Sequence, residues 1–467
     1  MTMKYIKLLI LMCCMVLSMT SCDDMSFLQI KPDDLVLTED SVKTPEHLQK
    51  FMVDAYQSIR GAGFMGGEML VAQDVMGGDA ITLENQYEWT QISSYTTDLF
   101  NAVGNTAWSD TYASINKANF AAFSSKADEI LAGANEATKN RLEADACFIR
   151  GLGHFHLVRI WGLPYDDTTK DVEGMGIPVR LRGTVSMDDA FIPVQRSTLE
   201  ATYTQIITDL KFAADNLPED RTWDCGFATR DAANAVLAKV YFYKGDMDNA
   251  ATYAGKVINK YDLDDDLKAK FARASQEGAT TKEVIFMIPS TGKSNDSWGA
   301  IRARYRTDDP AASTRCMPSS DLFNTIKANN GDKRFDAFFK EENGTYYTTK
   351  FDYDNMDCIV IAENELLLIY AEAAAKTDKA GAVAALNKIE RRAYGAPRTS
   401  DAASAETIMA NAQMERRFEL AFQGERIHDL KRQHKNVNRF EWNARQLLFE
   451  IPSAESNGNP DIIKNKN

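Results

Sequence analysis

Apolar residues recur at helical spacing through most of the chain. Between 139 and 161 they lie three or four residues apart, at Leu142, Ala146, Ile149 and Leu152. Gly162 and Pro164 then end this predicted helix. The same periodicity predicts further helices at 197–217, 231–244, 248–260, 363–376, 380–392 and 407–433, the last interrupted at Gly424. A chain with this pattern is expected to be dominated by α-helix.

Two stretches lack this periodicity. Residues 62–107 carry glycine and aromatic residues, and residues 285–360 hold long polar loops after one strand-like run at 284–288. Long loops without secondary structure are usually functional, so a binding site is expected in them. The sequence therefore predicts paired helices with long irregular loops and a few short strands.

The helices at 231–260 resemble a tetratricopeptide repeat. Small and aromatic residues on the first helix (Ala238 and Tyr241) precede a tight turn at Gly245, and Ala250 follows on the second. Small residues let two helices approach closely. A second hairpin, from Tyr370 onward, follows the pattern more loosely.

The N-terminus has the pattern of an export signal. Lys4 and Lys7 precede ten apolar residues, Leu8–Leu17, which are too few to span a membrane and suit a signal peptide. Small residues then lead to Cys22, as in the lipobox of bacterial lipoproteins. We expect residues 1–21 to be removed, Cys22 to carry lipid, and residues 22–45 to form a polar tether to the membrane.

Composition narrows the possible functions. The formal net charge of −14 argues against a nucleic-acid binder, which needs a basic surface. Hydrophobic residues make up 44% of the chain, which is ordinary for a globular protein. Four late cysteines lack metal-binding spacing and are expected to be free thiols: Cys147, Cys225, Cys316 and Cys358.

Candidate metal sites fail on spacing or ligand number. His428-Asp429 could begin a metal phosphohydrolase site, but His154 and His156 lie two apart on a helix and face different sides. Asp262, Asp264 and Asp266 begin like a calcium loop, which then lacks the required glycine and final glutamate. We therefore expect neither a metal nor a cofactor.

Aromatic residues in the loops are the remaining candidates for binding. Tyr and Trp rings stack on the faces of sugar rings, and Tyr87, Trp89, Trp298 and Tyr305 all lie outside the clear helices. Each could instead be a core residue beneath a loop. Trp108 and Trp161, within or at the end of helices, are expected in the core; Trp223, Tyr346 and Tyr347 are further loop aromatics.

The segment 415–432, ERRFELAFQGERIHDLKR, resembles the signature of the SusD/RagB family of nutrient-binding outer-membrane lipoproteins. Other stretches resemble the family in order along nearly the whole chain: Trp108 to Asn119, Arg150 to Pro164, Tyr370 to Ala373, Leu386 to Ala393 and Ile451 to Asn465. The chain departs from the family pattern at Ala362, where an arginine is usual, and at Lys464, where glutamine is usual.

The resemblance implies about four tetratricopeptide-like helix pairs in one domain, 46–467, with an N-terminal part to about 280 and a C-terminal part from about 281. It implies no catalysis. It implies a lid on a SusC-like TonB-dependent transporter that captures oligosaccharide at the outer-membrane surface. By position the site would include Tyr87, Trp89, Trp298 and Tyr305, with Asp79 and Asn85 binding hydroxyls.

The resemblance also assigns structural roles to charged residues of the signature, Glu419, Arg426 and Asp429, in packing the last helices. Asp23-Asp24 resembles an acidic surface-export signal. Three other readings remain open: a RagB-like member that captures peptides, a glycosidase with an unrecognised carboxylate pair, and a helical scaffold that binds only proteins.

Overall fold

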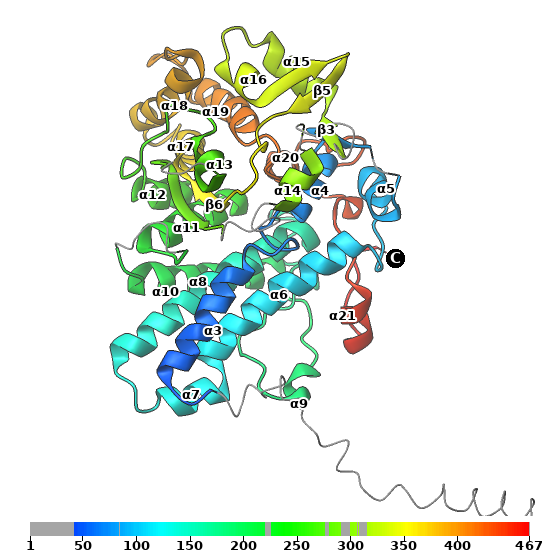
Figure 1. Ribbon diagram of the computed structural model, residues 1–467, viewed down its shortest axis with the longest axis vertical. Helices are drawn as coiled ribbons and strands as arrows, with labels where there is room; N and C mark the ends of the chain where they lie inside the picture. Colours follow the sequence, from blue (N-terminus) through cyan, green and yellow to red (C-terminus); the bar gives the residue numbers. More distant parts are fainter. Residues whose placement is uncertain are drawn as a thin grey trace, which may run out of the picture. The chain divides into compact units, whose positions relative to one another are not determined.

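Long antiparallel helices build the N-terminal part of the fold (Figure 1). The computed structural model describes residues 42–83, 85–219, 226–275, 280–290, 299–305, 307 and 315–466. Contacts group Pro45–Asn467 into one unit, described below, and Met1–Thr44 into another. The N-terminal part of the unit Pro45–Asn467 contains these helices: α3 (Pro45–Ser58), α6 (Ala102–Phe123), α8 (Glu136–Trp161), α10 (Leu199–Asn216), α11 (Arg230–Lys244) and α12 (Met247–Gly255).

Glycines let these helices approach closely. A Cβ atom at Gly153 of α8 would lie only 2.8 Å from Ile115 Cγ1 of α6, and one at Gly151 only 2.8 Å from Leu210 Cγ of α10. Trp108 and Trp161 are buried and meet edge to face at 5.1 Å. Both tryptophans therefore lie in the core, as the sequence predicts.

The predicted repeat at 231–260 is present as α11 and α12. Gly245, with φ of +82°, ends α11, and Ala238 and Ala250 are fully buried where the two helices pack. The second predicted hairpin is formed by α17 (Glu363–Ala373) and α18 (Lys379–Tyr394), against which α19 (Ala405–Glu419) packs. Tetratricopeptide-like pairs are therefore confirmed in both parts of the chain.

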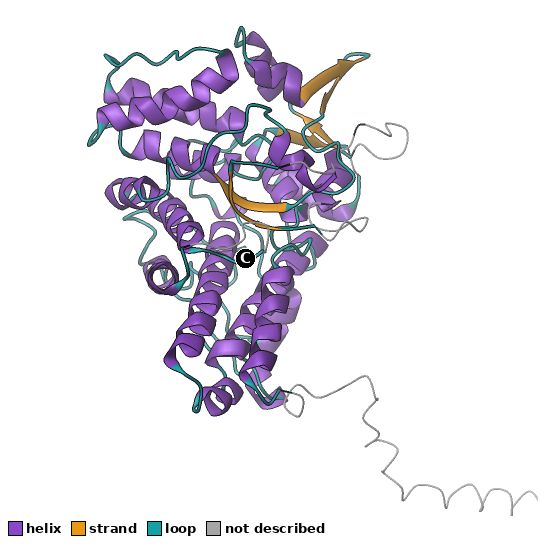
Figure 2. Ribbon diagram, turned by 60° about the vertical axis from the view of Figure 1, so that its left-hand side comes forward, coloured by secondary structure: helices purple, strands orange, loops and turns teal. Residues whose placement is uncertain are grey.

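The C-terminal part adds short strands and helices (Figure 2). The predicted strand is β2 (Val284–Ile288), which pairs antiparallel with β6 (Cys358–Ala362). The hairpin β4 (Phe339–Glu342) and β5 (Thr345–Thr348) follows α15 (Ser320–Ala328) and α16 (Lys333–Phe338). The remaining elements are short: α7 (Ser125–Leu131), α9 (Met187–Ala190), α13 (Ala269–Ala272), η2 (Arg273–Ser275), α20 (Arg426–Arg432), η3 (Arg445–Leu447) and α21 (Ser453–Gly458).

The prediction that residues 62–107 are largely irregular is wrong. They contain α4 (Glu68–Gly77), β1 (Ala80–Thr82), α5 (Tyr87–Ser94) and the start of α6. Every residue of α4 from Met69 to Gly77 is buried. A helix buried on all sides has no polar face, so the apolar periodicity that reveals a surface helix is missing.

The predicted helix at 407–433 is interrupted, as expected. It ends as α19 at Glu419 and resumes as α20 at Arg426, with Gly424 at φ of +75° between them. The helix predicted from 197 begins as α10 at Leu199, and its cap is Thr198, whose hydroxyl accepts from the Ala201 amide. Cys147, Cys316 and Cys358 are buried and form no disulfide among the described residues, and Cys225 lies outside those residues.

Candidate ligand-binding site

A short sheet joins the two loop regions that carry the predicted site. β1 pairs antiparallel with β3 (Cys316–Pro318), with Ala80 opposite Pro318 and Thr82 opposite Cys316. The Leu83 amide donates to the Arg315 carbonyl at 2.8 Å and so extends the pairing. Segments more than 200 residues apart thereby form one corner of the molecule, which also includes α5 and α14 (Gly299–Tyr305).

Trp89 is a buried residue of this corner. Its side chain is only 1% exposed, and the Arg304 guanidinium lies over the ring at 4.3 Å from the centroid. Arg304 also donates to Glu68 Oε1 at 2.6 Å, which links α14 to α4. A ring covered in this way offers no face to a ligand, so Trp89 acts as a packing residue under Arg304.

Tyr305 is also buried, at 1% exposure. Its hydroxyl donates to Asp74 Oδ2 at 3.1 Å, and the Gly424 amide donates to Asp74 Oδ1 at 2.8 Å. Burial raises the pKa of Tyr305 and of Asp74 well above their usual values. This predicted site residue therefore connects α14 to α4 and the 420–425 turn, away from solvent.

Asp79 has a similar internal role. It is 1% exposed and accepts two bonds from Arg417, from Nη2 at 2.7 Å and from Nε at 3.0 Å. Burial raises the pKa of Asp79, and Arg417 partly opposes this shift. Asp79 therefore holds the turn before β1 against α19, and its carboxylate is not presented to solvent.

Tyr87 is the predicted aromatic residue that the structure exposes, at 56%. Its hydroxyl donates to Asp98, which also accepts from Gln91 Nε2 at 2.8 Å. The hydrogen bond to Asp98 raises the pKa of the Tyr87 hydroxyl. The hydrogen bond from the Tyr87 hydroxyl to Asp98 thus holds the ring at the surface. Asn85 is exposed nearby in sequence, and Trp298 lies outside the described residues.

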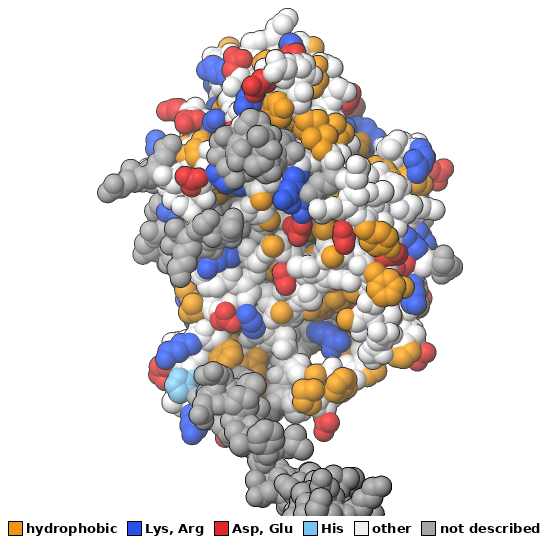
Figure 3. Space-filling model, turned by 45° about the vertical axis from the view of Figure 1, so that its right-hand side comes forward, with side chains coloured by type: hydrophobic (Ala, Val, Ile, Leu, Met, Phe, Trp, Pro, Cys, Tyr) orange, Lys and Arg blue, Asp and Glu red, His pale blue; other side chains and the backbone are white. Residues whose placement is uncertain are grey.

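Other exposed apolar residues lie near Tyr87 in the sequence, and the sequence pattern does not identify them as candidates for the site. Ile81 and Leu83 are 45% and 50% exposed, and Phe100 before α6 is also exposed. Figure 3 shows apolar side chains among charged ones on the side of the molecule turned toward the reader. The three residues of β1 run buried, exposed and half-buried, so Ile81 faces outward, and its apolar side chain gives no sequence signal for that exposure.

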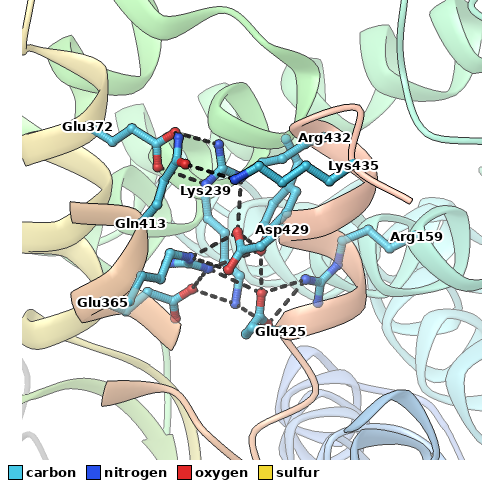
Figure 4. A network of polar contacts seen from close by, with 11 residues as sticks. Arg159, Lys239, Glu365, Glu372, Gln413, Glu425, Asp429, Arg432 and Lys435 are labelled. Atoms are coloured by element: carbon cyan, nitrogen blue, oxygen red, sulfur yellow. Dashed lines mark hydrogen bonds and ion pairs between the residues drawn. The ribbon is translucent and has the colours of Figure 1, made fainter. Parts of the chain in front are cut away.

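The signature segment 415–432 forms a buried ionic network, shown in Figure 4. Glu425 accepts from Arg159 Nη1 at 3.0 Å, from Lys239 Nζ at 2.8 Å and from the Tyr243 hydroxyl at 2.6 Å. Its pKa lies well below the usual value because these cations outweigh the effect of burial. Glu425 therefore joins α8, α11 and the segment before α20.

Asp429 extends this network, and Glu419 lies in a second buried ionic cluster. Asp429 accepts from Arg416 Nε at 2.9 Å, and Arg432 Nη2 donates to Glu372 at 2.7 Å. Glu419 pairs with Arg392 at 2.6 Å. The structural roles predicted for Glu419 and Asp429 are confirmed, since both are buried among cations. Arg426 lies 4.0 Å from Asp79, its nearest ion-pair partner among the described residues.

Three of the histidines, His154, His156 and His428, are buried packing residues. Burial lowers the pKa of His154 and of His156 to about 3, and His428 Nε2 contacts Gln73. Among the described residues, no three His, Cys, Asp or Glu side chains gather in a way that could hold a metal ion. The described helices also include none that is both long and apolar enough to cross a membrane.

Two family models match the chain in separate regions. Residues 26–242 match a model described as "Starch-binding associating with outer membrane", and residues 338–467 match the model of the SusD family. The first description names binding and membrane association, and it names no reaction. Together the two matches include most of the sequence, with the long helices α3 to α10 in the first and the signature segment in the second.

Two curated relatives are also SusD-like proteins. SusD-like protein P2 of Formosa agariphila is 26% identical over 292 residues, 61% of this chain and 53% of that protein. A SusD-like protein of Bacteroides ovatus is 32% identical over 171 residues, 34% of this chain and 28% of that protein. The chain thus spans about half or less of these relatives' lengths.

Among solved structures, a SusD superfamily protein from Bacteroides thetaiotaomicron superposes with a TM-score of 0.77 at 23% identity, over 91% of this chain and all of that one. A laminarin-binding SusD-like protein superposes with a TM-score of 0.71 at 21% identity, over 91% and 100%. These likenesses show that the fold is the SusD-like fold. With both family models matched in order along the sequence, the chain belongs to the SusD/RagB family.

Proposed function

We propose that this chain is a lipid-anchored receptor that captures oligosaccharide at the outer membrane and delivers it to a partner TonB-dependent transporter. The family description, starch binding with outer-membrane association, supports the ligand class and the location. The relative described as laminarin-binding has the same fold. The proposed anchor is Cys22, which lies outside the described residues.

One observation carries the proposed site: an exposed aromatic ring held in place by hydrogen bonding. Asp98 fixes the Tyr87 hydroxyl, so the ring needs little additional ordering when a sugar stacks on it. Ile81 and Leu83, shortly before Tyr87 in the sequence, are further exposed apolar side chains, and the Asn85 amide can hydrogen-bond sugar hydroxyls. Trp89, on the same helix as Tyr87, is buried and covered by Arg304.

The arrangement favours binding over catalysis. Three acidic residues of this corner already have partners: Glu68 pairs with Arg304, Asp79 with Arg417, and Asp98 with Tyr87. A glycosidase needs two carboxyl groups that face the scissile bond from either side. The carboxylates of Glu68, Asp79 and Asp98 instead hold parts of the structure together.

Isothermal titration calorimetry with a panel of oligosaccharides tests the proposal. Tyr87→Ala removes the ring and is expected to weaken binding roughly tenfold, since a stacked aromatic contributes about 1 kcal/mol beyond the area it buries. Tyr87→Phe keeps the ring but loses its bond to Asp98, and it should weaken binding less. Phe191→Ala, an exposed aromatic next to α9, is the matched control and should bind normally.

Three results would contradict the proposal in different ways. Equal affinity of Tyr87→Ala and the unaltered protein would remove Tyr87 from the site. Saturable binding of peptides with no binding of oligosaccharides would favour the peptide-capturing alternative. Release of new reducing ends from a bound oligosaccharide would show a glycosidase.

A further inference from the structure

A polar cavity lies on a different side of the molecule from Tyr87. It has a volume of about 560 Å³ and is bounded by the turn at 261–265, the start of α17 and one face of α18. In Figure 1, α17 and α18 lie on the left and α5 lies on the right, so the cavity is separate from the proposed glycan site. The inference drawn from it does not depend on the proposed function.

Cationic side chains dominate the lining. Lys282, Lys333 and Arg391 line the cavity, and none of the three has an ion-pair partner anywhere in the part of the chain that the structure describes. Lys388 adds a fourth cationic group, which donates to Asn259 Oδ1 at 2.6 Å. Four such cations around one hollow are unexpected in a chain of net charge −14.

Two buried polar atoms of the lining also lack partners. Glu363 is fully buried; its Oε1 accepts from the Asn259 amide at 3.2 Å, but its Oε2 has no hydrogen bond within the described structure. The Nη atoms of Arg392 bind Glu283 and Glu419, and its Nε is left without an acceptor there. Buried polar groups are normally hydrogen-bonded, so these two atoms are available to bind a ligand.

Both orphan groups can donate a hydrogen bond. Burial raises the pKa of Glu363 to about 8, so its carboxyl group carries a proton at neutral pH. The Nε of Arg392 always carries hydrogen. A ligand oxygen that accepts two hydrogen bonds and bears negative charge would satisfy both groups and the surrounding cations.

Acidic residues of the lining limit the size of the anion. Asp264 is buried and already accepts from the Thr281 hydroxyl and, at 2.9 Å, from the Lys282 amide. Asp262 and Asp265 lie on the same turn, and Asp265 is exposed. Their charges would repel an extended polyanion, while the four cations still exceed the three carboxylates.

We propose that this cavity binds a single oxyanion group, a carboxylate or a sulfate, whose charge is compensated by Lys282, Lys333, Lys388 and Arg391. The side chains of Glu363 and Arg392 donate hydrogen bonds to it from the buried wall. The group belongs either to a free inorganic anion or to an acidic sugar. Sulfate and glucuronate are therefore the two probes, and glucose is the neutral comparison.

Calorimetric titration of the whole protein tests this proposal. Sulfate, glucuronate or both should bind saturably, and glucose should not bind at the cavity. Lys333→Ala/Arg391→Ala should weaken anion binding by roughly tenfold or more, because a hydrogen bond to a charged group contributes more than one between neutral groups. Glu363→Gln keeps a neutral donor of the same shape and should retain binding.

The matched control is Lys376→Ala/Lys379→Ala, which removes two exposed lysines where α17 connects to α18, outside the cavity. It should bind the anions as the unaltered protein does. Tighter binding of glucuronate would identify an acidic sugar, and binding of sulfate alone would identify an inorganic anion or sulfate ester. The proposal is overturned if neither anion binds, or if the cavity and control variants bind equally well.

Discussion

Replacing Glu419 by glutamine tests whether the signature segment acts as a structural brace. Glu419 accepts from Arg392 Nη2 at 2.6 Å, from Arg334 Nη1 at 3.2 Å and from Asn364 Nδ2 at 3.0 Å, and it is 2% exposed. Glutamine has the same shape and no charge. The change therefore removes one of the carboxylates that compensate two buried guanidinium groups, without leaving a cavity.

The expected loss follows from the pKa of this group. Burial alone would raise the pKa of Glu419, but Arg392 and Arg334 lower it from 4.5 to about 2. At about 1.4 kcal/mol per pKa unit, the charged form contributes roughly 3 kcal/mol to folding. Breaking a buried ion pair costs about 3–5 kcal/mol, so the two arguments agree. We expect Glu419→Gln to lower the free energy of unfolding at pH 7 by about 3 kcal/mol.

The pH dependence of stability distinguishes loss of the Glu419 charge from a non-specific destabilisation of the fold. The folded pKa of Glu419 is lower than the unfolded one, so its contribution is present above about pH 4.3 and is lost as the pH falls toward 2. In urea denaturation, the difference between the unaltered protein and Glu419→Gln should fall to about half at pH 3. Glu441→Gln, on an exposed loop, is the control and should change stability by less than about 0.5 kcal/mol. A Glu419→Gln effect below about 1 kcal/mol at pH 7, or one independent of pH, would refute the reasoning.

Other features give sharp expectations. Gly424 and Gly344 both have φ of +75°, but a Cβ at Gly424 would lie 3.1 Å from Leu70, whereas none of the described atoms lies within 4 Å of one at Gly344. Gly424→Ala should therefore lower the denaturation midpoint more than Gly344→Ala, which adds only the backbone strain of about 1–2 kcal/mol; equal losses would contradict the close approach of Gly424 to Leu70. Burial raises the pKa of Cys147 to about 12, so mass spectrometry should find it unmodified by thiol reagents in the folded protein and labelled after unfolding; labelling of the folded protein at mildly alkaline pH would contradict its burial.

The helical repeats were predictable because their signals are local. Spacing of apolar residues located α8, α10, α11 and α17, and Gly245 marked the turn of the first repeat. The signature segment likewise predicted a structural role for its charges. Its partners Arg159 and Arg334 could not be found from sequence, because ion pairs between residues tens to hundreds of positions apart leave no periodic pattern.

The binding site was predictable only as a region. The two loop segments do meet, through β1 and β3, but sequence could not tell which aromatic residues are covered. Trp89 is buried because Arg304, more than 200 residues away, lies over its ring. Tyr87 two positions earlier is exposed because Asp98 holds its hydroxyl at the surface. Burial of single loop residues depends on such distant contacts.

A crystal structure of the protein with a bound oligosaccharide tests the central claim most directly. The quantity to measure is the separation between the Tyr87 ring and the nearest sugar ring. The account predicts van der Waals contact, at about 4 Å, with the sugar lying across Tyr87 and toward Leu83. An oligosaccharide bound elsewhere on the molecule, with the Tyr87 ring still open to solvent, would contradict it.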